Sequence, residues 1–189
     1  LTDDVFGDLQ PQWSPDGKTI AFASDRGEGV NLALLKFPHW QIATYDVESG
    51  RIDVLPDQAG LNTNPQWAPD SKSIAFVSDR SGIANVFLYE FETREHFKLT
   101  NVAGAIWAIT EYSPSISWAR RADRLAFTYY DNGEYTIWQV NNPRAMNPDA
   151  PAPAVLYVDD EAPNVTTFAR SFRRDYRVKS AASAEEAIG

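Results

Sequence analysis

The stretch PQWSPDGKTIAFASDR, residues 11–26, decides the fold because it recurs nearly unchanged as PQWAPDSKSIAFVSDR at residues 65–80. A third and weaker copy, SISWARRADRLAFTYY, spans residues 115–130. Each copy has a tryptophan that is followed, at the same distance, by a phenylalanine. These anchor pairs are Trp13 and Phe22, Trp67 and Phe76, and Trp118 and Phe127. A shared internal register with variable spacing outside it is typical of repeated supersecondary units.

Within each copy, a turn separates two strands. In Pro15-Asp16-Gly17 the proline fixes φ, the aspartate can bond its own backbone, and the glycine accepts a positive φ. One strand is expected to end at Gln12-Trp13, before the turn. After the turn, residues 19–23 predict a short apolar strand with both faces covered. Further strands are expected at residues 40–47 and 51–55.

The second copy predicts the same series, with its third and fourth strands at residues 85–91 and 96–99. Four antiparallel strands joined by hairpins make one blade of a β-propeller. We therefore predict a mainly all-β chain, with three four-stranded antiparallel blades in residues 1–141. The additional lengths at residues 27–39 and 102–114 are expected to be loops, because insertions there cost little.

The pattern Pro-x-Trp-Ser-Pro-Asp-Gly-x-x-Ile-Ala-Phe-x-Ser-Asp-Arg resembles the PD40, or WD40-like, repeat of TolB-like propellers, over residues 1–141. The third copy departs from it, with Arg120-Arg121-Ala122 in place of Pro-Asp-Gly. The resemblance implies a bacterial propeller, usually six-bladed, that acts as a non-enzymatic scaffold and binds a protein or peptide at its rim or channel. Some related propellers are joined to peptidase domains. An accessory propeller of a serine peptidase is therefore an alternative.

Three blades are too few to close a ring, because propellers have about four to eight. An open stack leaves a hydrophobic sheet face uncovered at each end, and we expect self-association through these exposed blades. Leu1-Thr2 matches Leu99-Thr100, which ends the second blade. The chain is therefore expected to begin in the last strand of a further blade.

A different module is expected after the blades. Residues 142–154 are rich in proline and predict a semi-extended linker. Residues 155–158 (VLYV) predict a strand, Pro163 opens a helix with an apolar face, and residues 176–180 predict a second strand. A capping box at Ser183-x-x-Glu186 opens another helix. This β-α-β-α order indicates an α/β fold.

Residues 155–189 resemble the opening of a response-regulator receiver domain, which has a flavodoxin-like fold. The resemblance implies that Asp159 and Asp160, after the first strand, bind Mg²⁺. We expect this binding to be weak and phosphorylation to be absent, because the family's phospho-accepting aspartate lies beyond this segment. A response regulator of a two-component phosphorelay is therefore an alternative function.

Composition excludes several classes of function. The net charge of −9 argues against a nucleic-acid backbone as the partner, and the lack of cysteine excludes disulfides and thiolate metal sites. No apolar run approaches the roughly 18 residues that a membrane-spanning helix needs. The compartment is left open, because the propeller resemblance suggests the periplasm and the receiver resemblance suggests the cytoplasm.

The motif residues are explained by structure more readily than by chemistry. Turn and strand-end hydrogen bonding accounts for the repeated aspartates better than a metal or catalytic role does: Asp16, Asp25, Asp70 and Asp79. Packing between blades is favoured over a ligand platform for the three anchor tryptophans.

The other candidates also favour a protein without enzymatic activity. His39 and His96 belong to no recognisable triad, and no G-x-S-x-G elbow is present. The basic group of Arg120, Arg121 and Arg124 predicts a solvated turn more than an anion site. The insertion at residues 27–39 carries four large apolar side chains, and packing over the blade is favoured there over ligand binding: Leu32, Leu34, Leu35 and Phe37.

Overall fold

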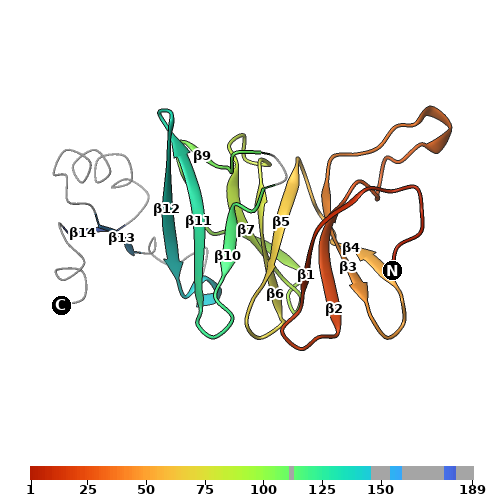
Figure 1. The fold of residues 1–189 in the computed structure, drawn as a ribbon, viewed down its shortest axis with the longest axis horizontal. Helices are drawn as coiled ribbons and strands as arrows, with labels where there is room; N and C mark the ends of the chain where they lie inside the picture. Colours follow the sequence, from red (N-terminus) through yellow and green to blue (C-terminus); the bar gives the residue numbers. More distant parts are fainter. Residues whose placement is uncertain (111–112, 146–153, 159–176, 182–189) are drawn as a thin grey trace.

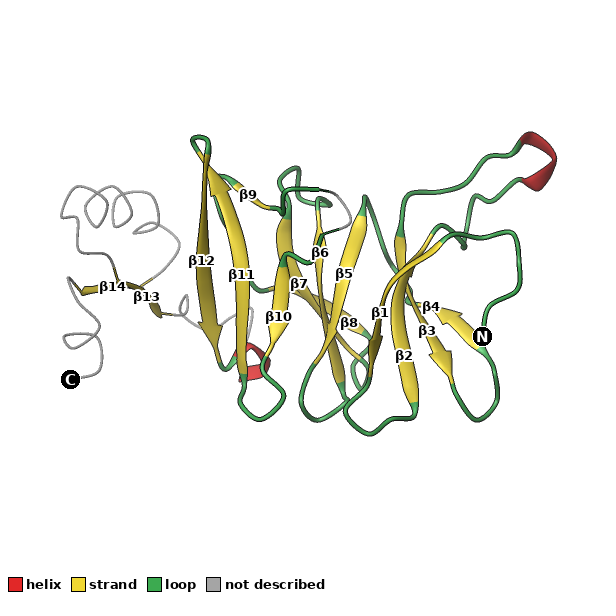
Figure 2. Cartoon of the chain, viewed as in Figure 1, coloured by secondary structure: helices red, strands yellow, loops and turns green. Residues whose placement is uncertain are grey.

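The computed structural model describes residues 1–110, 113–145, 154–158 and 177–181. Its main body is a row of three antiparallel sheets that stand side by side in chain order (Figures 1 and 2). The first sheet contains β1 (Asp8–Trp13), β2 (Thr19–Ser24), β3 (Gln41–Asp46) and β4 (Ile52–Val54). The second contains β5 (Asn62–Trp67), β6 (Ser73–Ser78), β7 (Asn85–Glu90) and β8 (Glu95–Lys98). The four-stranded prediction is confirmed for both copies.

The third sheet also has four antiparallel strands, as predicted, but they are arranged differently from those of the first two sheets. Its strands are β9 (Ala105–Ile106), β10 (Ile116–Trp118), β11 (Arg124–Asp131) and β12 (Glu134–Asn141). Two short strands, β9 and β10, pair with different parts of β11, where the other sheets have a single first strand. In the described residues, no strand pairs with the other edge of β12. The expected loop at 102–114 therefore contributes a strand. Gly104 permits this approach, because a Cβ there would collide with the Tyr130 carbonyl.

A bulge in the first strand joins neighbouring blades. The register shifts near Gln10 in β1 and near Asn64 in β5, and these two residues have positive φ values of 55° and 57°. The Asn64 amide donates to Gln10 Oε1 at 2.7 Å, and the Ser115 amide donates to Asn64 Oδ1 at 3.0 Å. Because all three residues stand three positions before an anchor tryptophan, the first strands are linked at one repeat position.

The core lies between the sheets. Between the first two, Ala21, Ala23 and Ile42 pack against Phe76 and Phe87. Small side chains on one sheet leave room for aromatic rings from the next, which gives the dense interlocking that stabilises such interfaces. The same positions form the second interface, where Ala75, Val77 and Val86 meet Trp118, Leu125 and Phe127.

Beyond the blades, β13 (Ala154–Val158) and β14 (Arg177–Ala181) form a parallel pair. The two strands predicted in this module are therefore confirmed, to within a residue at each end. A short 3₁₀ helix, η2 (Pro143–Ala145), lies inside the expected linker. Asp159, Asp160 and both predicted helices lie outside the described residues. In the described ranges, no helix has the length and hydropathy needed to cross a membrane.

Candidate binding groove between the first two blades

The repeated Ser-Asp-Arg triplet connects strands within each of the first two blades. Arg26 donates two hydrogen bonds of 2.8 Å to the Asp8 carboxylate, and its guanidinium lies 5.6 Å from the centre of the Phe22 ring. Arg80 repeats this arrangement with a 3.0 Å bond to Asn62 Oδ1, and burial lowers the pKa of Arg80. Asp8 and Asn62 belong to first strands. Each arginine therefore ties the end of a second strand to the first strand of the same blade.

Two of the repeated aspartates close their turns. Asp16 Oδ1 accepts hydrogen bonds from Ser14 Oγ at 2.6 Å and from the Lys18 amide at 3.1 Å, and these bonds lower the pKa of Asp16. Asp70 Oδ1 accepts a 3.0 Å bond from the Lys72 amide. The basic side chains of the third turn are exposed, as expected for a solvated turn: Arg120, Arg121 and Arg124.

The other two aspartates bind the start of the neighbouring strand. Asp25 Oδ1 accepts a 2.9 Å bond from the Gly7 amide, and Asp79 Oδ1 accepts a 2.7 Å bond from the Leu61 amide. These bonds confirm the turn and strand-end prediction for the motif aspartates. Across the described part of the chain, no three His, Cys, Asp or Glu side chains gather where a metal ion could bind.

The two histidines lie apart. His39 is exposed on the insertion of the first blade. His96, on β8, lies with Nε2 2.8 Å from the Pro56 carbonyl and its ring 4.9 Å from the Tyr89 ring. Because a carbonyl can only accept, Nε2 carries the proton. Burial lowers the pKa of His96, which keeps the ring neutral near pH 7. His96 therefore joins the first two blades.

The three anchor tryptophans have different environments. Trp67 is 9% exposed and Trp118 is 5% exposed, whereas Trp13 is 59% exposed. Trp67 Nε1 donates a 3.2 Å hydrogen bond to the Gln12 carbonyl of the first blade. Packing between blades is therefore confirmed for Trp67 and Trp118. Trp13 differs because no described blade stands in front of the first sheet.

The insertion at residues 27–39 projects away from its blade (Figures 1 and 2). Its tip is a 3₁₀ turn, η1 (Leu32–Leu34), whose cap Asn31 accepts a 3.1 Å bond from the Leu34 amide. Leu34 and Leu35 are more than 70% exposed, at 75% and 77%. The prediction that the leucines pack over the blade is therefore wrong, because the tip closes on itself. Phe37 alone packs back, edge-on against Phe6 at 6.3 Å.

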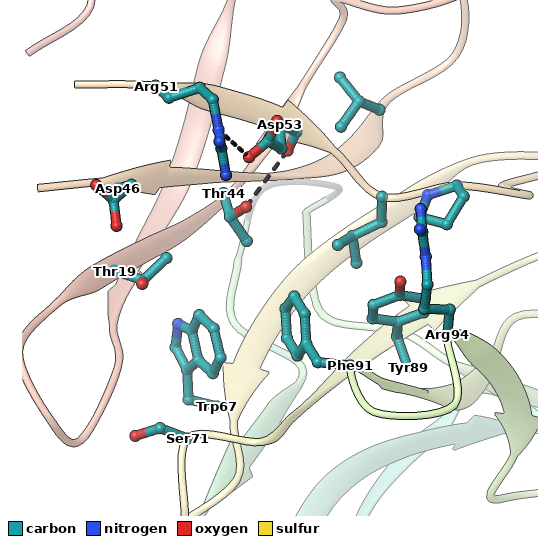
Figure 3. Close-up of a pocket in the computed structure, with 13 residues that line it drawn as sticks. Thr19, Thr44, Asp46, Arg51, Asp53, Trp67, Ser71, Tyr89, Phe91 and Arg94 are labelled. Atoms are coloured by element: carbon teal, nitrogen blue, oxygen red, sulfur yellow. Dashed lines mark hydrogen bonds and ion pairs between the residues drawn. The ribbon is translucent and has the colours of Figure 1, made fainter. Parts of the chain in front are cut away.

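A groove of about 520 Å³ separates the first and second blades (Figure 3). One wall comes from the β3–β4 hairpin and the other from the ends of β5 and β7 and the turn after β7. A volume of this size suits a small ligand or a few residues of an extended peptide.

The second-blade wall is aromatic. Phe91 stacks on Trp67 with ring centres 5.4 Å apart and planes 9° from parallel, and Tyr89 meets Phe91 edge-on at 5.1 Å. Phe91 is 36% exposed, so part of its ring is open to a ligand. Figure 3 shows the Trp67 and Phe91 rings next to each other at the groove. Rings held by such contacts offer a rigid apolar surface.

The first-blade wall is polar. Arg51 donates a 2.8 Å hydrogen bond to Asp53, and Thr44 lies beside this pair (Figure 3). Hydrogen bonds from Ser49 lower the pKa of Asp46, so its carboxylate is ionised at neutral pH. Arg94 adds a positive charge from the second blade. The groove therefore combines an apolar shelf with hydrogen-bonding and charged groups of both signs.

Sequence reasoning did not find this groove. Tyr89 and Phe91 stand two positions apart at a strand end, which was a signal for two rings on one face, but they lie outside the repeated motif. The polar wall comes from another hairpin more than thirty positions earlier in the chain. Only the packing of one blade on the next brings the two walls together.

No protein-family model matches the chain. The chain is 29% identical over 134 residues to dipeptidyl-peptidase 5 of Porphyromonas gingivalis, covering 68% of this chain and 18% of that protein. It is 31% identical over 99 residues to the Tol-Pal system protein TolB of Anaeromyxobacter dehalogenans, covering 52% of this chain and 21% of that protein. The chain thus spans about a fifth of the length of these curated relatives.

Solved propeller structures share the fold. A putative TolB from Agrobacterium tumefaciens superposes with a TM-score of 0.54 at 20% identity, over 76% of this chain and 48% of that one. Puromycin hydrolase superposes with a TM-score of 0.56 at 18% identity, over 74% of this chain and 21% of that one. These likenesses support the TolB-like propeller resemblance. They give no support to the receiver interpretation of residues 155–189.

Proposed function

We propose that this chain is a non-enzymatic propeller scaffold that binds an extended segment of a protein or peptide at the rim. The observation that carries the proposal is the groove between the first two blades, with its open Phe91 ring against Trp67 and its Arg51–Asp53 pair opposite. The likeness to Tol-Pal system proteins supports a scaffold of this kind.

The groove favours a peptide with one large apolar side chain. That side chain would lie on the Phe91 ring, because part of the ring is exposed and its stacking on Trp67 holds it in place. The peptide backbone would then run past Thr44 and Asp53, whose side chains can donate and accept hydrogen bonds. Arg94 and Asp46 would select for charges on either side of the apolar residue.

The test is selection of a phage-displayed random heptapeptide library on the immobilised 189-residue chain, followed by fluorescence anisotropy with the selected peptides. Phe91→Ala is expected to weaken binding about tenfold or more, as loss of a central aromatic contact does. Ile109→Ala is the matched control, because Ile109 is also large and exposed but lies outside the groove. Failure to enrich any peptide, or equal binding by the Phe91→Ala variant, would contradict the proposal.

An accessory propeller of a serine peptidase is the second candidate. The similarity to dipeptidyl-peptidase 5 and to puromycin hydrolase favours it. We expect no peptidase or esterase turnover from the chain itself. An antibody raised against residues 1–141 would recover the polypeptide that carries these blades from its own cells. Labelling of that polypeptide by a fluorophosphonate probe would support the peptidase candidate and contradict the non-enzymatic scaffold.

Residues 155–189 carry a separate proposal, namely that Asp159 and Asp160 hold Mg²⁺ weakly in a receiver-like unit. Its support is the parallel pairing of β13 with β14, an arrangement that needs a crossover connection such as a helix. Titration with Mg²⁺ by calorimetry, for the chain and for its Asp159→Asn variant, measures the binding. Acetyl phosphate followed by mass spectrometry is expected to leave the chain unlabelled. Stable phosphate on the chain would contradict the expectation that residues 155–189 do not include the phospho-accepting aspartate.

A further inference from the structure

The turn between β7 and β8 differs from the corresponding turn of the first blade at one strained position. In the first blade, the Gly50 amide closes the turn with a 2.9 Å hydrogen bond to the Asp46 carbonyl, and the φ of Gly50 is 71°. In the second blade, the Arg94 amide donates a 2.8 Å bond to the Glu90 carbonyl, and the φ of Arg94 is 62°. Arg94 therefore stands where the first blade has glycine, with the same left-handed backbone.

An arginine at this position is unfavourable for the backbone. Glycine enters the left-handed region freely, whereas a residue with a Cβ meets steric strain there. Strained backbone of this kind is concentrated at functional sites. Arg94 is exposed, and its side chain lines the groove. A role in binding for the guanidinium therefore accounts for an arginine at a position that suits glycine.

Arg94 also carries the unpaired positive charge of the groove. The other arginine of the lining, Arg51, is paired with Asp53 at 2.8 Å. Asp46 uses its carboxylate within its own turn, where it accepts bonds of 2.8 Å and 2.5 Å from Ser49. Within the described residues, the Arg94 side chain has no hydrogen bond or ion pair. Its donors are therefore open to a ligand with a negative charge.

The neighbours of Arg94 limit how much negative charge the groove accepts. Three glutamates of the same hairpin lie within four positions of it: Glu90, Glu92 and Glu95. In the described structure none of them forms an ion pair with Arg94. Their charges would repel any further carboxylates of a ligand. A ligand with a single carboxylate is therefore favoured over an acidic run.

We propose that Arg94 selects a peptide that carries one carboxylate close to its large apolar side chain, an inference that rests on the function proposed above. The planar guanidinium would donate to both carboxylate oxygens, while the apolar side chain lies on Phe91. Phe91 and Arg94 come from the same turn and both line the groove, so one short segment can reach them (Figure 3). Aspartate, glutamate and a peptide C-terminus supply the same chemistry.

The first test compares synthetic versions of the heptapeptides selected on the chain, by fluorescence anisotropy. Replacing the acidic residue by its amide should weaken binding about threefold to tenfold, as loss of an exposed charge-assisted bond does. Replacing it by lysine should weaken binding further. Each peptide is made with a free and with an amidated C-terminus, because the loss on amidation measures any part of the terminal carboxylate. If neither replacement of the side chain nor amidation weakens binding, the inference is wrong.

The second test changes the chain. Arg94→Glu should make the lysine-containing peptide the tighter ligand. Arg120→Glu is the matched control, because Arg120 is an exposed arginine of another turn, outside the groove, and the net charge changes equally. Arg94→Gly restores the residue found at Gly50. It should lose the preference for the carboxylate, while the urea midpoint of unfolding stays the same or rises.

These measurements separate the two proposals. If no peptide is enriched, or if Phe91→Ala binds as the unchanged chain does, both proposals fail. If binding depends on Phe91 but Arg94→Glu keeps the preference for the acidic peptide, only the role of Arg94 is overturned. Loss of that preference in Arg120→Glu, or a lower unfolding midpoint in Arg94→Gly, would also overturn it, because the first indicates general electrostatics and the second a structural role.

Discussion

The backbone amide of Ser115 donates a 3.0 Å hydrogen bond to Oδ1 of Asn64, across the boundary between the second and third blades. Asn64 can make this bond because its backbone is in the left-handed region, with φ at 57°, where the bulge in β5 turns the side chain toward the next blade. Asparagine enters this region more readily than most residues do. Residues at one repeat position thus link the first strands of neighbouring blades and set their relative orientation.

The first prediction concerns that bond. Asn64→Gly keeps the left-handed backbone but removes the acceptor, so the Ser115 amide loses its partner in a buried setting. We expect a loss of about 1–3 kcal/mol in the free energy of unfolding, measured by urea denaturation. Asn132→Gly is the control, because Asn132 also has a positive φ, of 50°, but lies in an exposed hairpin turn. Equal effects of the two substitutions would contradict the role given to Asn64.

His96 predicts that acid weakens the blade contact. Burial lowers the pKa of His96 in the folded chain, so below the ordinary value of 6.5 the unfolded chain binds the additional proton first. The stability from the neutral ring is fully present above pH 6.5 and is lost as the pH falls toward the folded pKa. His96→Gln should flatten the pH dependence of the unfolding midpoint in this range. His39→Gln, on an exposed side chain, should leave the profile unchanged.

Arg144, which lies outside the repeats, is expected to contribute to the stability of the folded chain. This residue of η2 forms ion pairs with Asp70 in the turn of the second blade and with Asp123 in the turn of the third, the latter at 3.1 Å. These pairs raise the pKa of Arg144 despite its partial burial. Arg144→Ala should lower the free energy of unfolding by up to about 1 kcal/mol, as for a partly exposed pair. High salt should reduce the difference. Arg51→Ala, which breaks a pair within one blade, should have a smaller effect.

Gly60 predicts a strong effect of one added methyl group. Its φ is 66°, and a Cβ there would collide with Asp79 Oδ1, the atom that holds the Leu61 amide. Gly60→Ala should therefore cost about 1–2 kcal/mol for the backbone and about 1–3 kcal/mol more for the collision. Gly82→Ala has the same kind of φ, at 91°, with no atom within 4 Å of the added carbon. Thermal unfolding should show Gly82→Ala to be the milder change.

The sequence by itself determined the repeat, the strands of the first two blades and the structural roles of the motif aspartates. It could do so because these features are local: a Pro-Asp-Gly turn, an apolar strand and a terminal Ser-Asp-Arg lie within sixteen residues. The hydrogen bonds of Asp16 lie within the same short stretch, whereas Asp25 binds the Gly7 amide outside it. The local sequence likewise predicts strands at residues 155–158 and 176–180, and the structure has β13 and β14 within one residue of these bounds.

Only the tertiary structure decided which copies of a residue are buried. Trp13 and Trp67 stand in nearly identical sequences, yet one is 59% exposed and the other 9%, because burial depends on whether a blade stands in front. The groove has the same origin, since Phe91 and Asp53 meet only after two blades pack. Strand β9 forms because Gly104 has no side chain and lets residues 102–114 approach β11 closely. Such contacts join residues far apart in the chain, and a short motif does not specify which residues will pack against it.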